Sequence, residues 1–307
     1  MRDEFLSASA NTLAAAQRQQ LEADHTFKRL VELELEPVRG SFDAAHLKAV
    51  HHRIFQDLPD AGFHEVTPGE FRTQVPHGQD WMKQRGLSTM GGTFHVVYSR
   101  MDDAAMARLD KALEEASPDE LRGLKTAEFT ARLARMYIEL DYAHPFSDGN
   151  SRTLRTFTRQ LAREAGYEVD WARFGHSETG RDLLHIARDR SVNELAKPHV
   201  QHENTMRKIL RTQDKLKAHP PLPDLLRDAV RPSRALAFER LNEREALREY
   251  PELEAAYKVI HAAATRLASQ MPGNPEAQEA GIQSVMNHVQ NCLNAGETVD
   301  FGHSQKR

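Results

Sequence analysis

The densest polar stretch of the sequence is His144-Pro-Phe-Ser-Asp148-Gly-Asn-Ser151-Arg152-Thr-Leu-Arg155. Apolar residues repeat at spacings of three and four on both sides of it: Phe129, Leu133, Met136, Tyr137 and Leu140 before it, and Leu154, Phe157 and Leu161 after it. This spacing is typical of helices with one buried face. Because Pro145 cannot continue the first helix, the pattern predicts two helices joined by a polar loop.

The loop has the components of a phosphate-binding site. Gly149 and Asn150 tolerate positive φ, and a turn of that kind can direct successive backbone N–H groups at one anion. The second helix begins there, and a helix N-terminus carries partial positive charge and unpaired donors. Arg152 and Arg155 lie three positions apart on this helix, so they share a face and could bind further phosphate oxygens.

His144 and Asp148 add groups that a simple phosphate site would not need. Histidine titrates near neutral pH and can take a proton from an attacking hydroxyl. A carboxylate beside phosphates is a natural ligand for Mg²⁺. The combination indicates metal-assisted transfer of a nucleotidyl or phosphoryl group to a hydroxyl. In the alternative interpretation, His144-Pro145 only ends a helix, Asp148 caps the next one and the arginines are solvated.

The stretch resembles the signature of the Fic family, His-x-Phe-x-(Asp/Glu)-Gly-Asn-Gly-Arg-x-x-Arg, and matches it at every defined position except Ser151, where glycine is usual. The resemblance extends over roughly residues 40–205. It implies an enzyme that transfers AMP from ATP to a Ser, Thr or Tyr hydroxyl of a target protein and releases pyrophosphate. Two alternatives stay open: the same fold with another donor, as in UMP or phosphocholine transfer, and a catalytically weak binding module.

The resemblance also implies a role for each matching residue. His144 would be the general base, Phe146 a buried anchor of the loop, Asp148 the ligand of Mg²⁺, Arg152 the contact of the β-phosphate and Arg155 that of the γ-phosphate. Gly149, Asn150 and Ser151 would form an anion hole through backbone and amide donors.

Ser151 is the one departure from the signature. Serine would cost about 1 kcal/mol if the position required positive φ. It would be well tolerated if the position already lay in the first turn of the helix. We expect the second case.

Between residues 61 and 100 the helical pattern lapses, and proline and glycine recur. Two β-favouring pieces, residues 70–75 and 93–98, are predicted to pair as a hairpin. In the Fic resemblance, a hairpin flap in this region covers the active-site loop and pairs with the main chain of the target. Glu70, Phe71, Arg72 and Thr73 would then form the target-docking flap. The alternative is an ordinary surface hairpin.

Glycine and proline are scarce in the whole chain, 16 and 14 of 307 residues, which favours helices. We predict an all-α fold: a Fic-type helical core with a small β-hairpin flap, plus a C-terminal helical appendage. The predicted parts are an N-terminal helical extension over residues 1–40, a catalytic domain over 41–217 and a helical region over 218–307. The last boundary is placed at the stiff segment His219-Pro-Pro-Leu-Pro223.

The sequence also limits partners and location. A net charge of −4 gives no reason to expect nucleic acid, and no apolar run approaches the ~20 residues of a membrane span. The single Cys292 fits a reducing compartment, so we expect a cytoplasmic protein.

The resemblance also has an implication for regulation. Many Fic proteins carry an inhibitory helix with a Ser/Thr-x-x-x-Glu motif, and no Ser or Thr of this sequence is followed by Glu at that spacing. The resemblance therefore implies a toxin-like enzyme that is restrained by a separate small antitoxin protein contacting Arg155. By family analogy alone, the target would be a type II topoisomerase subunit.

Overall fold

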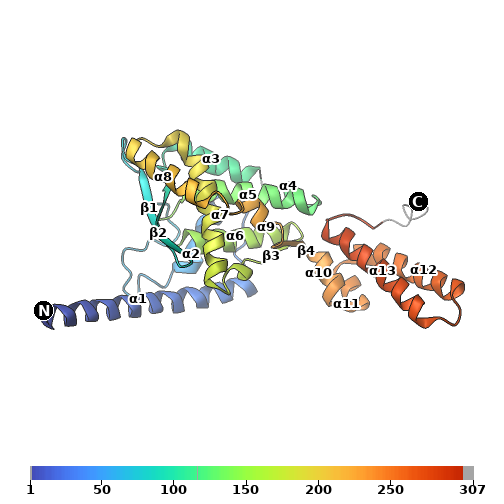
Figure 1. Ribbon diagram of the computed structural model, residues 1–307. Coiled ribbons are helices and arrows are strands. Elements are labelled where there is room, and N and C mark those ends of the chain that lie inside the picture. The colour runs from blue at the N-terminus through green and yellow to red at the C-terminus, as the bar shows by residue number, and fades with distance from the viewer. Residues whose placement is uncertain (1, 116, 300–307) are drawn as a thin grey trace.

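The chain is mostly helical, and its few strands form two antiparallel pairs in the part of the chain that the structure describes (Figure 1). A computed structural model describes residues 2–115 and 117–299, with side chains from residue 15 onward. The predicted all-α class is confirmed.

In chain order, with η for short 3₁₀ helices, the elements are α1 (Arg2–Leu35), α2 (Ala44–Phe55), β1 (Trp81–Leu87), β2 (Met90–Tyr98), α3 (Asp103–Glu114), α4 (Pro118–Leu121), α5 (Thr126–Ala143), α6 (Asn150–Glu164), β3 (Tyr167–Val169), η1 (Ala172–Phe174), α7 (Glu178–Ala196), η2 (Lys197–His199), α8 (Glu203–Leu216), α9 (Leu222–Leu226), β4 (Val230–Pro232), α10 (Ser233–Arg240), α11 (Glu243–Glu249), η3 (Pro251–Leu253), α12 (Glu254–Gln270) and α13 (Pro275–Asn294).

Helix α5 is the central element of the main core. It packs against α3, α6, α7 and α9, and its predicted apolar stripe is buried. Helix α6 buries Leu154, Phe157 and Leu161 and packs against α2. The predicted helix, loop and helix are therefore confirmed, and the loop between α5 and α6 is held from both sides by packed helices.

The hairpin lies in the expected region, but one of its two strands was wrongly predicted. Strand β2 covers residues 93–98, whereas its partner is β1, not residues 70–75. Residues 70–75 are irregular because their backbone donors bind other loops: Arg72 N donates to Pro145 O (2.8 Å) and Val75 N to Arg100 O (2.8 Å). Residues Glu70, Phe71, Arg72 and Thr73 are thus not part of a flap strand.

The outer edge of β2 is occupied by side chains from two helices. Asn193 of α7 accepts from Val97 N (3.1 Å) and donates to His95 O (2.9 Å), as a neighbouring strand would. The Thr212 hydroxyl of α8 accepts from His95 N (3.0 Å). These bonds fix the hairpin on the helical body and leave β1 as its outer strand.

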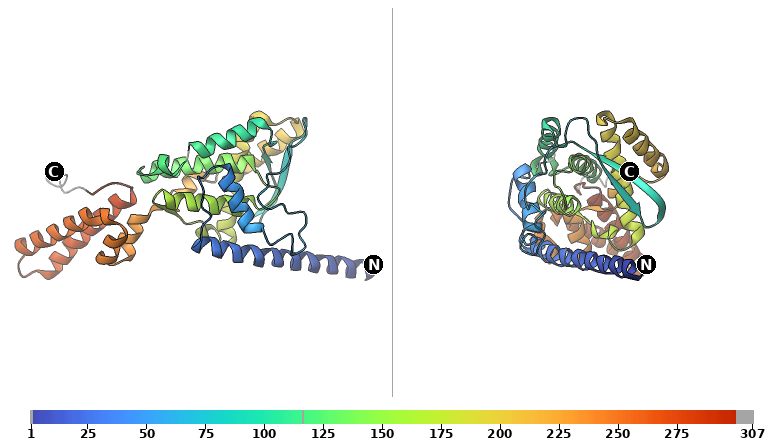
Figure 2. Two further views of the ribbon diagram at one scale, coloured as in Figure 1. Left: turned by 180° about the vertical axis from the view of Figure 1, so that it is seen from behind. Right: turned by 90° about the vertical axis from the view of Figure 1, so that its left-hand side faces the viewer.

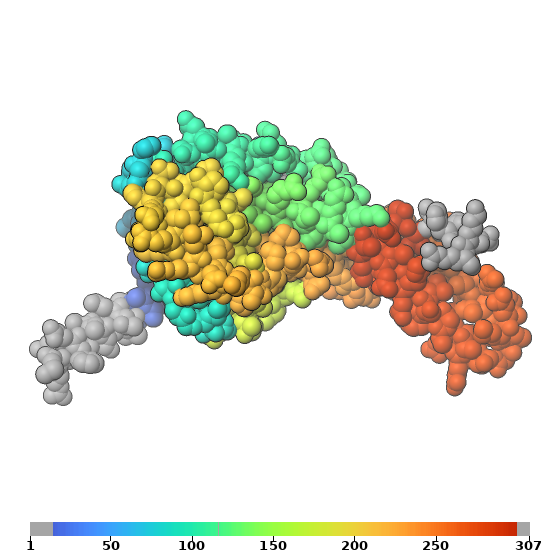
Figure 3. Space-filling model, turned by 45° about the horizontal axis from the view of Figure 1, so that its top comes forward, coloured from blue at the N-terminus to red at the C-terminus, as the bar shows by residue number. Residues whose placement is uncertain are grey.

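The chain has a second core, and it begins later than predicted. Leu222 and Leu226 are buried in the main core, and β4 pairs with β3, so residues 218–232 pack with the main core. The second core is built from α10 to α13 and starts at Ala235. These helices form a lobe at one end of the body (Figures 2 and 3).

Helix α1 lies along the body and extends beyond it at its N-terminal end (Figures 1 and 2). It packs on α2, and its Arg29 forms a bidentate ion pair with Asp57, in the turn after α2 (2.6 Å for both bonds). None of the helices in the described ranges combines the length and the apolar character needed to cross a bilayer.

Candidate active site

The bend between α5 and α6 begins at His144, which caps α5 in the left-handed conformation (φ 46°, ψ 59°). Its N–H donates to Leu140 O (3.0 Å), as in an αL helix cap. Non-glycine residues adopt this conformation at a cost of about 1 kcal/mol or more. The Arg72 guanidinium supports it by donating to His144 O (2.8 Å), Ala143 O (3.2 Å) and Ser99 O (2.7 Å). Arg72 therefore holds the C-terminus of α5, where a cation is favourable.

The His144 imidazole is buried among groups that set its protonation. Its ring stacks on Tyr98 (3.7 Å between centroids), Nε2 lies 3.2 Å from Lys83 Nζ, and Nδ1 lies 3.8 Å from Asp141 Oδ1. A lysine ammonium can only donate, so Nε2 is the acceptor and the imidazole proton lies on Nδ1, facing Asp141. Burial lowers the pKa of His144 to about 4 and outweighs the opposite effect of Asp141. The side chain is therefore a neutral base at neutral pH, with its lone pair on Nε2.

Asp141 and Arg188 form a buried ion pair behind this base. Arg188, from α7, donates to both carboxylate oxygens of Asp141 (2.7 and 2.9 Å), and the two residues are 2% and 1% exposed. Although burial opposes it, the Arg188 charge lowers the pKa of Asp141, which stays ionised. Arg188 also donates to the Ser151 hydroxyl (2.9 Å). The Arg188 guanidinium thus connects α5, α6 and α7 next to His144.

The loop is fastened internally by Phe146 and Asn150. Phe146 is fully buried and stacks on His51 of α2 (3.8 Å between centroids). Asn150 accepts from Phe146 N (2.9 Å) and donates to Phe146 O (2.7 Å), and it is 3% exposed. Phe146 lies where a loop anchor should be, but the Asn150 amide closes the loop. One of the two N–H groups of this amide is therefore used within the loop, and its donation to an anion stays a prediction.

Gly149 has the positive φ (71°) that the sequence predicted, and it precedes the first turn of α6. A Cβ at this position would lie 2.1 Å from the Phe55 ring, so only glycine fits. The neighbouring Asp148 is exposed, and its Oδ1 accepts from Gly149 N (2.7 Å). His51 bonds the Asp148 carbonyl through Nε2 (3.2 Å), which holds the loop against α2.

The N-terminus of α6 offers backbone donors next to this loop. The first helical bond from this end runs from Thr153 N to Gly149 O (3.1 Å), so the N–H groups of residues 150–152 have no partner within the helix. Ser151 is the second residue of α6 and is not among the residues with positive φ, so serine causes no backbone strain there. Its hydroxyl is bound by Arg188.

The two signature arginines have different environments. Arg152 donates to Glu22 Oε1 (2.5 Å) and to the Thr26 hydroxyl (3.2 Å), both on α1. Arg155 donates only to Ser151 O (3.2 Å) and has no carboxylate partner among the described residues. Burial lowers the pKa of Arg155, with further contributions from Arg188 and Arg152. A partly buried guanidinium without a counter-ion, beside a helix N-terminus, is suited to an anion.

The structure brings His144, Asp148 and the N-terminus of α6 to one bend, whereas Glu70, Phe71 and Thr73 lie outside it. Glu70 and Thr73 are exposed, and the Phe71 ring packs edge-on against Phe146.

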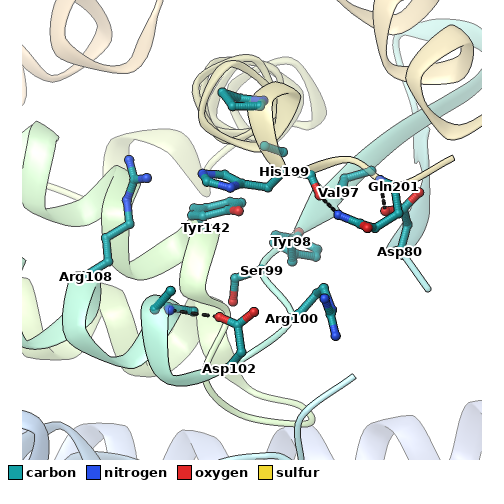
Figure 4. A pocket seen from close by; sticks show the side chains of 14 residues that line it. Asp80, Val97, Tyr98, Ser99, Arg100, Asp102, Arg108, Tyr142, His199 and Gln201 are labelled. Carbon is teal, nitrogen blue, oxygen red and sulfur yellow. Dashed lines mark hydrogen bonds between the residues drawn. The ribbon is translucent and has the colours of Figure 1, made fainter. Parts of the chain in front are cut away.

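A separate pocket of about 210 Å³ lies at the base of the hairpin (Figure 4). Tyr98 lines it together with Tyr142 and His199, but it contains none of the signature residues.

Four residues of this site were missed from the sequence: Lys83, Asp141, Arg188 and Glu22. Asp141 could have been found, because a carboxylate three positions before His144 lies on the same helix face. The other three come from β1, α7 and α1, and no local pattern connects them with the signature.

Substituting Gly149 by alanine tests the close packing of the loop on α2. Gly149→Ala should lower the free energy of unfolding by about 2–4 kcal/mol, because a clash with Phe55 adds to the strain of positive φ. Gly123→Ala is the matched control: Gly123 has a similar φ (76°) and no atom within 4 Å of the added Cβ. It should lose only about 1 kcal/mol. Equal losses for both variants in urea unfolding would contradict the packing.

The sequence is similar to known proteins over the part that contains this site. The sequence model of the Fic/DOC family matches residues 41–162. The chain is 31% identical over 170 residues to the probable protein adenylyltransferase Fic of Escherichia coli, which covers 54% of this chain and 73% of that protein. It is 30% identical over 167 residues to the protein adenylyltransferase VbhT of Bartonella schoenbuchensis, which covers 54% of this chain but only 30% of VbhT. The BepC protein of Bartonella tribocorum, solved with bound AMPPNP, is 19% identical, with a TM-score of 0.45 over 71% of this chain and 88% of that one. The chain belongs to the Fic/DOC family.

Proposed function

We propose that the chain is a protein adenylyltransferase, which transfers AMP from ATP to a Ser, Thr or Tyr hydroxyl and releases pyrophosphate. The observation that carries the proposal is the neutral, buried His144 next to the N-terminus of α6, whose first N–H groups have no partner within the helix. Relatives that carry this activity in their names, at 30–31% identity, support the same choice. The chain spans under a third of VbhT, so the activity of the whole protein is an inference.

In the proposed reaction, the residues of the site transfer a proton, stabilise charge and bind the phosphates. Nε2 of His144 takes the proton of the target hydroxyl as its oxygen bonds to the α-phosphorus. The bond to the β-phosphate oxygen breaks, and pyrophosphate leaves with the electron pair. The imidazolium formed in this step faces the Asp141 carboxylate at 3.8 Å, which stabilises its charge. The N–H groups of residues 150–152 and the Arg155 guanidinium bind the phosphates.

We further propose that Asp148 contributes to a Mg²⁺ site. It is the exposed carboxylate of the loop, and one oxygen already accepts from Gly149 N. No cluster of three or more His, Cys, Asp or Glu residues that could hold a metal occurs in the described ranges. A single carboxylate fits Mg²⁺, which keeps several waters and takes further ligands from substrate phosphates. The ion would neutralise charge on the phosphates.

For the target, we propose strand addition to β1. The outer edge of β2 is already bonded by Asn193 and Thr212, whereas no described segment bonds the outer edge of β1. A target segment paired with β1 would place its side chains near His144, which the inner face of β1 contacts through Lys83. This assigns target docking to β1 instead of residues 70–73.

Restraint by a separate antitoxin remains a proposal, and Arg155 is the available contact for its glutamate. Within this chain, Glu22 of α1 already neutralises Arg152 and would compete with a phosphate for that guanidinium. We also propose a type II topoisomerase subunit as the target, by family analogy. From the sequence composition, we propose a cytoplasmic location and no membrane or nucleic-acid partner. Transfer of UMP or phosphocholine, and a catalytically weak binding module, are the alternative functions.

Labelling of lysate proteins tests the proposed reaction. The chain, ATP radiolabelled at the α-phosphate, Mg²⁺ and a bacterial lysate should give labelled protein bands. His144→Ala should remove the label, because it deletes the proposed general base. Label that forms only from UTP, label that survives in His144→Ala, or no label from any donor would reject the proposal.

Removing the Glu22 carboxylate should strengthen ATP binding. Glu22→Gln frees Arg152 for a phosphate, and the Kd for ATP, measured by calorimetry, should fall about tenfold, the equivalent of ~1.4 kcal/mol. Glu34→Gln is the matched control, since Glu34 also links α1 to α6, through Arg159 and Arg163 (2.9 Å), but outside the site. An unchanged Kd in Glu22→Gln, or an equal gain in Glu34→Gln, would show that Glu22 does not compete.

A further inference from the structure

The polar group that contacts Nε2 of the proposed base is the amine of Lys83, on strand β1 of the hairpin. Lys83 Nζ lies 3.2 Å from His144 Nε2. A group that receives AMP must lie within about this distance of the base to pass its proton to it. This amine occupies the place that the mechanism gives to the target hydroxyl. It is also a nucleophile in its own right once it is neutral.

The hairpin holds Lys83 at this place through its neighbours. Trp81, Lys83 and Arg85 alternate along β1 and share its inner face. Arg85 is fixed by a bidentate ion pair with the buried Asp189 of α7 (2.5 and 3.0 Å). On the other side, Trp81 lies under the Arg72 guanidinium (3.6 Å). With both neighbours anchored, the register of β1 brings Lys83 to the imidazole.

No carboxylate competes for this amine. Among the described residues Lys83 forms no ion pair, because Asp141 is bound by Arg188 and Asp189 by Arg85. Its chain lies between aromatic rings, with Nζ 4.8 Å from the Trp81 centroid and 5.8 Å from that of Tyr98. Burial lowers the pKa of Lys83, and the Arg72 and Arg85 charges act in the same direction, against Asp148 and Asp141. These surroundings enlarge the neutral, nucleophilic fraction of the amine.

We propose that Lys83 is an internal acceptor, so that the chain adenylylates its own flap lysine and forms a phosphoramidate. The inference rests on the proposed AMP transfer. The Nζ lone pair bonds to the α-phosphorus of ATP, and the bond from that phosphorus to the β-phosphate oxygen breaks. Pyrophosphate leaves with the electron pair, and one Nζ proton passes to His144 Nε2. A lysine that carries AMP would fill the acceptor position, so this product would be inactive toward other targets.

The test follows the modification on the full chain incubated with α-labelled ATP, Mg²⁺ and a bacterial lysate. The expected product gains the mass of one AMP, and trypsin no longer cleaves between Lys83 and Gln84. The label on the chain should be lost in mild acid, which hydrolyses the N–P bond of a phosphoramidate but leaves phosphate esters of Ser, Thr and Tyr intact. These readouts need no variant.

Variants then locate the acceptor. Lys83→Arg keeps a cation beside His144 but should lose the acid-labile label completely. Lys215→Arg should retain it, because Lys215 contacts the same hairpin at Phe94 (5.6 Å) and is not in contact with His144. His144→Ala should lose it.

The outcomes distinguish failure of the Lys83 modification from failure of the proposed AMP transfer. Labelled lysate proteins together with an unmodified Lys83, or a self-label that is stable in acid and maps to a hydroxyl, would overturn the inference and leave the proposed function standing. No label on any protein would overturn both.

Discussion

The buried Asp141 and Arg188 pair is the interaction on which the site depends. Two opposite charges removed from water gain little net stability, since the cost of desolvation offsets their attraction. Breaking one partner, however, would leave a buried charge uncompensated, at about 3–5 kcal/mol. The pair therefore contributes mainly to geometry: Arg188 connects α5, α6 and α7, and Asp141 faces Nδ1 of His144.

The rest of the site follows from this arrangement. His144 ends α5 in a strained conformation, and Arg72 compensates by binding the carbonyl groups at the end of that helix. Gly149 then lets the chain turn tightly against Phe55 into α6. The result is a positive region built from a helix N-terminus and several guanidinium groups. Glu22 neutralises one of them, Arg152, while Arg155 keeps its charge available for an anion.

The helices and the loop could be predicted because the information is local. The apolar spacing of residues 129–140 and 154–161, Pro145 and Gly149 each determine structure within a few positions. Strand β1 was missed because Lys and Gly have low strand propensity, and its position is fixed by tertiary contacts such as Arg85 with Asp189. Residues 70–75 have suitable strand composition, but their backbone groups bind two other loops. The roles of Arg188, Glu22 and Lys83 depend on contacts between distant segments, which a single sequence does not reveal.

The assignment of Nε2 of His144 as the base is tested most directly by titrating this imidazole by NMR, with both ring nitrogens labelled. The proton should lie on Nδ1, and the ring should stay neutral from about pH 8 to about pH 5, because burial depresses the pKa of His144 far below the ordinary 6.5. An imidazole that carries its proton on Nε2, or that becomes charged at or above pH 6.5, would contradict the assignment of Nε2 as the base.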